Sequence, residues 1–235
     1  MIATKDPRFP QLGAGEIARF AHEGMIAEWD MKTLNGNSLR DLTGQGNHAL
    51  FNAAPTVTAQ GISFNGTYWA DMTLTAPLLN EFAFFLVHRV PADGYLAFGD
   101  RNASTRQGYC LRMINYAQVY SQSDSNEGLG PVSNGNIWTA TIVKVDAEGH
   151  ARIKSLTGGV LGYTHALRAD GDDLRTMWRI GAGIANLNGA DSVYQPLMSG
   201  TLAYAGIFNR MPSEDQDAAL ASYLRAALAP RGIVI

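Results

Sequence analysis

The sequence predicts one all-β domain, an antiparallel β-sandwich with a single α-helix near its C-terminus. Short runs of apolar, β-branched and aromatic residues recur between turn signals along most of the chain, and only one long segment has the period of a packed helix. Strands at this cadence favour a sandwich or jelly roll over alternating strand–helix units. Hydrophobic residues make up 46% of the chain and charged residues 17%, so a large core can form.

The first half of the chain contains a hairpin signal and a buried strand. The stretch ISFNGTYWADM (62–72) places Asn65-Gly66, the strongest short hairpin signal, between two alternating runs. We therefore expect a β-hairpin there. The run FAFFLVHRV (82–90) is almost wholly apolar, which predicts a strand that is covered on both faces.

A second hairpin is predicted in the other half. The run NIWTATIVKV (136–145) reaches a turn at Glu148-Gly149 and continues into HARIKSL (150–156). Apolar and β-branched residues occupy both faces of the first run, so both faces are expected to be at least partly covered. Further strands are expected at 25–30, 95–99, 176–183 and 200–209.

The helix is expected over residues 213–229. Ser213 and Gln216 have the spacing of a capping box, and Pro230 stops the helix. From Leu220 onward, apolar residues recur with the i, i+3, i+4, i+7 spacing of a single packed stripe. This pattern predicts one face packed on the sandwich.

The domain organisation follows from these elements. Residues 25–235 are predicted to form the sandwich domain with its C-terminal helix. Residues 1–24 are predicted to be an N-terminal extension with a short helix within 15–24, and this extension is a candidate assembly arm.

Charge and cysteine content exclude several classes of function. Lysine and arginine total 18 against 21 acidic residues, without a basic run, so nucleic-acid binding is not expected. No stretch approaches the ~20 apolar residues of a membrane helix, so no membrane insertion is expected. Cys110 is the only cysteine, which excludes an intrachain disulfide. The first residues lack the apolar core of a secretory signal, so we expect synthesis and folding in a host cytoplasm or another reducing compartment.

The stretch LRDLTGQGNHALF (39–51) is a polar turn between apolar flanks. Gly44 and Gly46 allow a positive φ without a Cβ penalty. Asp41 and Asn47 can accept hydrogen bonds from nearby backbone amides. These habits predict a turn that pins the fold.

The same turn belongs to a longer series of motifs. It has the order D-L-T-G-Q-G-N over residues 41–47, follows a strand containing Trp29, and precedes ISFNG (62–66). Near the end, IFNRMPS (207–213) leads into the helix. In order and spacing these motifs resemble the laminin-G-like domains of the concanavalin A-like lectin and glucanase superfamily. The resemblance spans roughly residues 25–229 and implies a jelly-roll sandwich.

The resemblance implies two kinds of site. Members of the superfamily often hold a structural calcium ion, so Asp41 and Asn47, joined by Asp30, are alternative ligands for Ca²⁺, although calcium takes six to eight oxygens and this turn offers fewer. No other cofactor is expected. Glucanases of the superfamily carry alternating carboxylates about 5 Å apart on one strand. The sequence has no E-x-D-x-E pattern, so no catalytic residue is expected and the chain is predicted not to be an enzyme.

A carbohydrate-binding surface is predicted in the middle of the chain. Tyr116, Gln118 and Tyr120 alternate along one strand and therefore share a face, and Asp124 and Asn126 lie in the polar loop that follows. Aromatic rings stack on the apolar faces of sugars, and Asp and Asn side chains bind hydroxyls. The alternative is that these aromatics serve the core or protein interfaces.

We therefore expect a non-catalytic structural or adhesive module. A chain with this domain nearly alone, without disulfides or a signal peptide, resembles bacteriophage virion proteins of the tail, fibre or capsid-decoration kind. The expected location is the virion, and the expected partners are other virion proteins, copies of the same chain or cell-surface glycans. Alternatives are a soluble lectin-like carbohydrate-binding module and a glycoside hydrolase with an atypical site.

Overall fold

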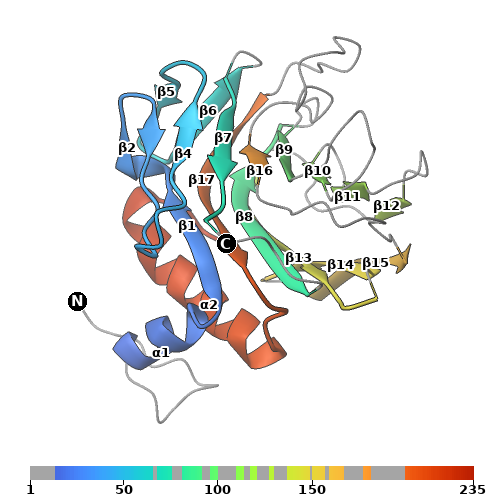
Figure 1. The fold of residues 1–235 in the computed structure, drawn as a ribbon. Helices are drawn as coiled ribbons and strands as arrows, with labels where there is room; N and C mark the ends of the chain where they lie inside the picture. Colours follow the sequence, from blue (N-terminus) through green and yellow to red (C-terminus); the bar gives the residue numbers. More distant parts are fainter. Residues whose placement is uncertain are drawn as a thin grey trace.

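Two antiparallel sheets pack face to face as a β-sandwich (Figure 1). The computed structural model of the chain describes residues 14–65, 68–75, 81–91, 96–99, 110–113, 117–120, 127–129, 137–148, 150–156, 159–166, 177–180 and 199–235. Within these residues one sheet has eight strands and the other has nine. The predicted fold class, an all-β sandwich with one C-terminal helix, is confirmed.

The eight-stranded sheet, called sheet A, has the order β15-β14-β13-β8-β17-β6-β5, and β1 also pairs with β17. Its strands are β1 (Met25–Asp30), β5 (Thr56–Val57), β6 (Ile62–Asn65), β8 (Phe82–Arg89), β13 (Thr139–Val145), β14 (His150–Ser155), β15 (Gly159–Ala166) and β17 (Ser199–Phe208). β8 and β13 are buried along nearly their whole length, as their apolar runs predict. The predicted hairpin between β13 and β14 is also confirmed.

The nine-stranded sheet, called sheet B, has the order β12-β11-β10-β9-β16-β7-β4-β3-β2. Its strands are β2 (Leu34–Asn35), β3 (Ser38–Leu39), β4 (Ala49–Phe51), β7 (Ala70–Thr73), β9 (Leu96–Gly99), β10 (Cys110–Met113), β11 (Ala117–Tyr120), β12 (Glu127–Leu129) and β16 (Met177–Ile180). A 3₁₀ turn, η1 (Met31–Thr33), leads from β1 of sheet A into β2 of sheet B.

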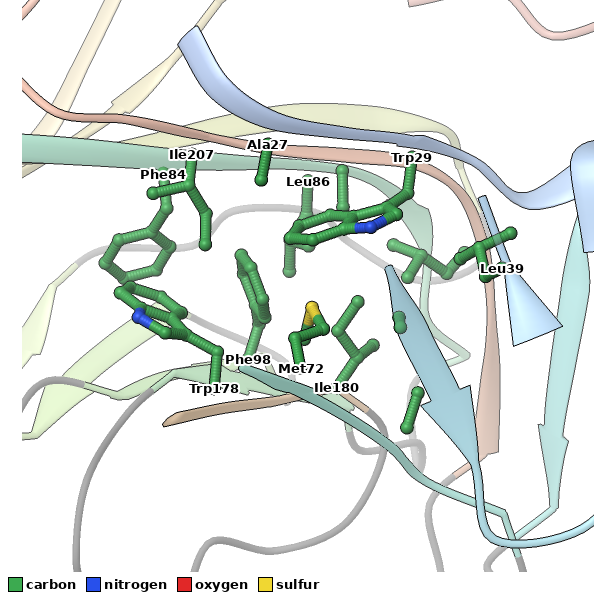
Figure 2. Packing of buried hydrophobic residues seen from close by; sticks show 14 of the residues in the cluster. Ala27, Trp29, Leu39, Met72, Phe84, Leu86, Phe98, Trp178, Ile180 and Ile207 are labelled. Atoms are coloured by element: carbon green, nitrogen blue, oxygen red, sulfur yellow. The ribbon is translucent and has the colours of Figure 1, made fainter. Parts of the chain in front are cut away.

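Aromatic rings from both sheets meet in the core between them (Figure 2). Trp29 and Phe84 extend from sheet A, and Phe98 and Trp178 extend from sheet B. The ring centroid of Phe84 lies 5.4 Å from that of Phe98 and 5.1 Å from that of Trp178. The ring centroid of Trp29 lies 6.4 Å from that of Phe98. These distances fall in the range of favourable edge-to-face aromatic pairs.

The hairpin predicted at Asn65-Gly66 is wrong. β6, before this dipeptide, pairs with β5 and β17 in sheet A, whereas β7, after it, pairs with β4 and β16 in sheet B. Each run does bury alternate side chains, for example Ile62 in β6 and Met72 in β7, but it buries them from opposite sides of one core. The alternation therefore indicates a buried face and does not identify the pairing partner.

Helix α2 (Glu214–Leu228) continues into a 3₁₀ turn, η3 (Ala229–Arg231), close to the predicted bounds. The Ser213 hydroxyl accepts the backbone N–H of Gln216, as a capping box predicts. The Gln216 side chain does not complete the box. Its amide nitrogen donates to the Glu23 carbonyl at 2.5 Å, and its oxygen accepts from Arg210 at 3.2 Å. Gln216 therefore ties α2 to the chain just before β1.

Helix α2 lies on the outer face of sheet A, and the N-terminal helix α1 (Ala14–Ala21) lies beside α2 (Figure 1). Apolar side chains of α2 form a second buried cluster with those that sheet A presents on this side, including Phe85, Val87, Phe208, Leu220, Leu224 and Leu228. Helix α1 adds Ala21 to this cluster. Among the described residues, no helix has the length and apolar character needed to cross a membrane.

A hydrogen-bond network holds His22, the residue that follows α1. The Glu28 carboxylate in β1 lies 2.8 Å from His22 Nε2 and accepts the Tyr204 hydroxyl at 2.6 Å. The Tyr204 hydroxyl lies 3.1 Å from that of Tyr223 in α2. These contacts join α1, β1, β17 and α2. Residues 1–13 lie outside the described residues, so the assembly arm remains a prediction.

The network favours the protonated form of His22. Burial by itself lowers the pKa of His22, but the hydrogen bond and negative charge of Glu28, together with the Ala18 carbonyl, outweigh burial and raise the pKa above its ordinary 6.5. Both ring nitrogens face acceptors, since Nδ1 lies 2.5 Å from the Ala18 carbonyl oxygen. Burial and the Glu28 charge raise the pKa of Tyr204, so its hydroxyl keeps the proton that it donates.

We predict that the contribution of His22 to the free energy of unfolding decreases as the pH rises. A group whose pKa is raised on folding contributes stability that is fully present below its unfolded pKa, 6.5, and is lost as the pH rises through its folded pKa. The free energy of unfolding, measured with urea at a series of pH values, should therefore fall more steeply across this window in the wild type than in His22→Gln. Parallel pH profiles for the two proteins would contradict this assignment.

Candidate functional site

The Asp41 carboxylate is the centre of the polar turn. Oδ1 accepts the backbone N–H groups of Glu28 at 3.1 Å and Thr43 at 3.0 Å. Oδ2 accepts the backbone N–H of Asn47 at 3.0 Å, and the Thr43 hydroxyl donates to the same carboxylate at 2.8 Å. Asp41 is 2% exposed, so these donors take the place of water. Gly44 and Gly46 have positive φ, as expected.

Asn47 extends the turn to both sheets. Its side-chain nitrogen donates to the Ile26 carbonyl in β1 at 2.6 Å, and its side-chain oxygen accepts the Thr75 N–H, just beyond β7, at 2.7 Å. Its backbone carbonyl accepts the indole N–H of Trp29 at 2.8 Å. The turn therefore connects sheet A, sheet B and the core side chain of Trp29.

The three predicted calcium ligands do not converge. Asp41 and Asn47 are brought together, but Asp30 accepts the Lys32 N–H at 2.8 Å and pairs with Arg231, the last residue of η3. The side-chain oxygens of Asp41 and Asn47 already accept protein donors. This donor set does not fit a Ca²⁺ ion, which takes six to eight oxygens. The contacts favour the alternative that the turn pins the fold, and the calcium site remains a prediction.

Replacement of Asp41 by Ala should destabilise the protein strongly. The buried N–H groups of Glu28 and Asn47 lose their acceptor, and an unsatisfied buried donor costs about 1–3 kcal/mol. We expect a loss of about 2–5 kcal/mol in the free energy of unfolding measured with urea. Glu81→Ala, at an exposed carboxylate, is the control and should change little. A loss of under about 1 kcal/mol in Asp41→Ala would show that the turn is not what holds β1.

Calcium should not change the stability of the protein. A ligand present at 100 times its dissociation constant adds about 2.7 kcal/mol to the folded state when it binds only that state. Because the oxygens of Asp41 and Asn47 are engaged by protein donors, we expect equal melting temperatures in EGTA and in millimolar Ca²⁺. A calcium-dependent rise that Asn47→Ala abolishes would instead establish the predicted ion site.

A continuous cross-strand row runs along sheet B. Directly opposed residues of antiparallel strands lie on the same face of a sheet, so this row defines one face. In order, its positions are Tyr120, Cys110, Gly99, Arg179, Asp71, Leu50 and Ser38. The chain neighbours of Arg179 and Asp71 point into the core, so the row lies on the outer face.

Three side chains form a fixed cluster on this outer face. Arg179 donates to both oxygens of Asp71, from Nε at 2.5 Å and from a terminal nitrogen at 2.9 Å. The guanidinium carbon lies 5.5 Å from the ring centre of Trp69, within the range of a cation–π contact. The Asp71 side chain is 37% exposed, whereas that of Arg179 is 9% exposed. The cluster thus presents a half-buried aromatic ring beside an oriented, accessible carboxylate.

The predicted carbohydrate surface is only partly within the described residues. The backbone of β11 places Gln118 opposite Arg112 and Tyr120 opposite Cys110, in line with the cluster. Tyr116, Asp124 and Asn126 lie outside the described residues, so this surface remains a prediction.

Trp69, Asp71 and Arg179 were not predicted as site residues from the sequence. One signal was present, because Trp69 and Asp71 alternate with apolar residues and so share a strand face. The pairing with Arg179, 108 residues further along the chain, had no local signal.

No protein-family model matches the chain, and no curated protein matches it. Among solved structures, the receptor binding domain of botulinum neurotoxin D aligns with a TM-score of 0.64 at 11% identity, over 86% of this chain and 53% of that chain. The corresponding domain of the C/D mosaic serotype aligns with a TM-score of 0.63 at 11% identity, over 85% of this chain and 51% of that chain.

A sialidase of Trypanosoma rangeli, solved in complex with a difluoro-KDN compound, aligns with a TM-score of 0.60 at 10% identity. The alignment covers 88% of this chain and 33% of the sialidase. This chain thus spans about half of each neurotoxin domain and a third of the sialidase. At these identities the likeness concerns the fold, a β-sandwich of the jelly-roll kind.

Proposed function

We propose that the chain is a non-catalytic glycan-binding module and that the outer face of sheet B carries its site. The observation behind this proposal is the cluster of Trp69, Asp71 and Arg179. Sugars offer apolar C–H faces to aromatic rings and pairs of hydroxyls to carboxylates. An ionised carboxylate has about four acceptor positions, and Arg179 uses one on each oxygen of Asp71. Among the described residues no other donor to Asp71 is found, so the remaining positions are proposed to accept hydroxyl donors.

The cluster is ordered before any ligand arrives. The bidentate contact with Arg179 fixes the orientation of Asp71, and the guanidinium restricts Trp69 from one side. A site that is already ordered loses less conformational entropy on binding, so more of the contact energy appears as affinity. The outer face of sheet A is less suited to this role, since α2 covers it.

The cluster lacks the pair of carboxyl groups that glycoside hydrolysis usually requires. Hydrolysis in most such enzymes requires two carboxyl groups that are about 5–9.5 Å apart. Among the described residues paired directly with Asp71 and Arg179 across the sheet, Leu50 and Gly99, neither is acidic. Asp71 itself is held by a guanidinium on both oxygens.

We propose that glycan binding serves to attach the protein to a cell surface. The neurotoxin domains with a similar fold are named for receptor binding, which supports an adhesive function without identifying a ligand. We propose a bacteriophage tail, fibre or capsid-decoration protein as the setting, from the general resemblance of the chain to such virion proteins and not from any single residue. A free lectin-like module would use the same face and differ only in lacking a particle to which it is attached.

Binding of the full chain to an array of bacterial surface glycans tests the proposal. We expect a saturable hit whose affinity falls at least tenfold, about 1.4 kcal/mol, in Trp69→Ala and in Asp71→Asn. Asp215→Asn changes an exposed carboxylate on α2 and should bind as the wild type does. A blank array would contradict the proposal. A hit that both variants retain would also contradict it. Binding that is lost only in Tyr120→Ala would place the site on β11 instead.

A further inference from the structure

Three side chains of the kinds that bind metal ions lie at the tip of the β13–β14 hairpin. Asp146, Glu148 and His150 each offer one ligand atom, and these atoms all lie within 4.8 Å of one another. His150 Nδ1 lies 3.2 Å from each oxygen of the Asp146 carboxylate. The group belongs to sheet A and shares no residue with the outer face of sheet B.

The hairpin holds two of these side chains in place. The Asp146 N–H donates to the His150 carbonyl at 3.1 Å, and the His150 N–H donates to Asp146 Oδ1 at 2.8 Å. The adjoining pair, Val145 and Ala151, is buried in the core. The strands below the turn are therefore anchored, and the imidazole and the carboxylate need little reorganisation to bind an ion together.

The spacing agrees with the dimensions of a metal site. In a tetrahedral site with metal–ligand bonds of about 2.0–2.1 Å, neighbouring ligand atoms are about 3.3–3.4 Å apart. The 3.2 Å separation between His150 Nδ1 and the Asp146 oxygens is close to this edge. A cation can therefore replace the proton that bridges the two groups. The His150 side chain is 43% exposed and Glu148 is exposed, so an ion and its remaining water can enter.

We propose that Asp146, Glu148 and His150 form a binding site for a divalent transition metal of the Zn²⁺ type. Imidazole nitrogen suits zinc and its neighbours, whereas calcium and magnesium prefer all-oxygen sites. Two carboxylates neutralise the charge of the ion, and water completes its coordination.

Calorimetric titration of the full chain with Zn²⁺ alone, in a buffer that does not chelate metals, tests the site. We expect one zinc ion per chain and at least a tenfold loss of affinity in His150→Ala. Asp146→Asn and Glu148→Gln should each weaken binding. Asp146→Asn keeps an acceptor for the His150 N–H, so it tests the charge without opening the turn. Glu81→Gln, an exposed carboxylate elsewhere in the described chain, is the matched control.

Circular dichroism establishes whether each variant is folded. If His150→Ala does not fold, Glu148→Gln still tests the site. The proposal is overturned if the wild type takes up no zinc, if His150→Ala and Glu148→Gln bind zinc as the wild type does, or if Ca²⁺ displaces Zn²⁺ at equal concentration.

Discussion

The Asp41 carboxylate holds the first strand of sheet A against the turn that leads into sheet B. It accepts backbone donors from Glu28 in β1 and from Asn47 in the turn. Asn47 in turn bonds to β1, to the indole of Trp29 and to the chain beyond β7. Because both residues are almost fully buried, water cannot replace these contacts. The positions of Trp29 in the core and of β4 in sheet B both depend on this one turn.

The two sheets divide their faces differently, and this difference decides where binding can occur. Sheet A lies between the core and α2, so β8 is apolar on both sides from Phe82 to Val87 and this part has no face for a ligand. In sheet B, β7 buries Ala70 and Met72 and turns Asp71 outward, where Arg179 of β16 pairs with it. Among the described residues, no helix packs on this outer face. A polar cluster can therefore be ordered by the sheet and remain accessible.

Local patterns in the sequence predicted the elements well. The apolar run of β8, the turn between β13 and β14, and the capping residue Ser213 each depend on neighbours a few positions away. Pairings between distant strands were not predictable in this way. The strands on either side of the Asn65-Gly66 signal, β6 and β7, belong to different sheets and do not pair with each other.

The candidate site shows the same limit. Trp69 lies just before β7 and Asp71 lies within it, a spacing that is visible in the sequence, but Asp71 gains its orientation from Arg179, 108 positions later. The contacts of Gln216 with Glu23 and Arg210 are likewise tertiary and replaced the local bond that a complete capping box requires. Conversely, the prediction of a fold-pinning turn at residues 39–51 depended on local bonding habits of Asp and Asn, and the contacts of Asp41 agree with it.

Amide chemical-shift mapping tests most directly the claim that the outer face of sheet B is the binding face. In this experiment the ¹⁵N-labelled full chain is titrated with the strongest ligand from the array. The account predicts progressive shifts at the indole of Trp69 and at the amides of Asp71 and Arg179, with α2 unaffected. Shifts centred on α2 or on the Asp41 turn, with the amides of β7 and β16 unchanged, would contradict it.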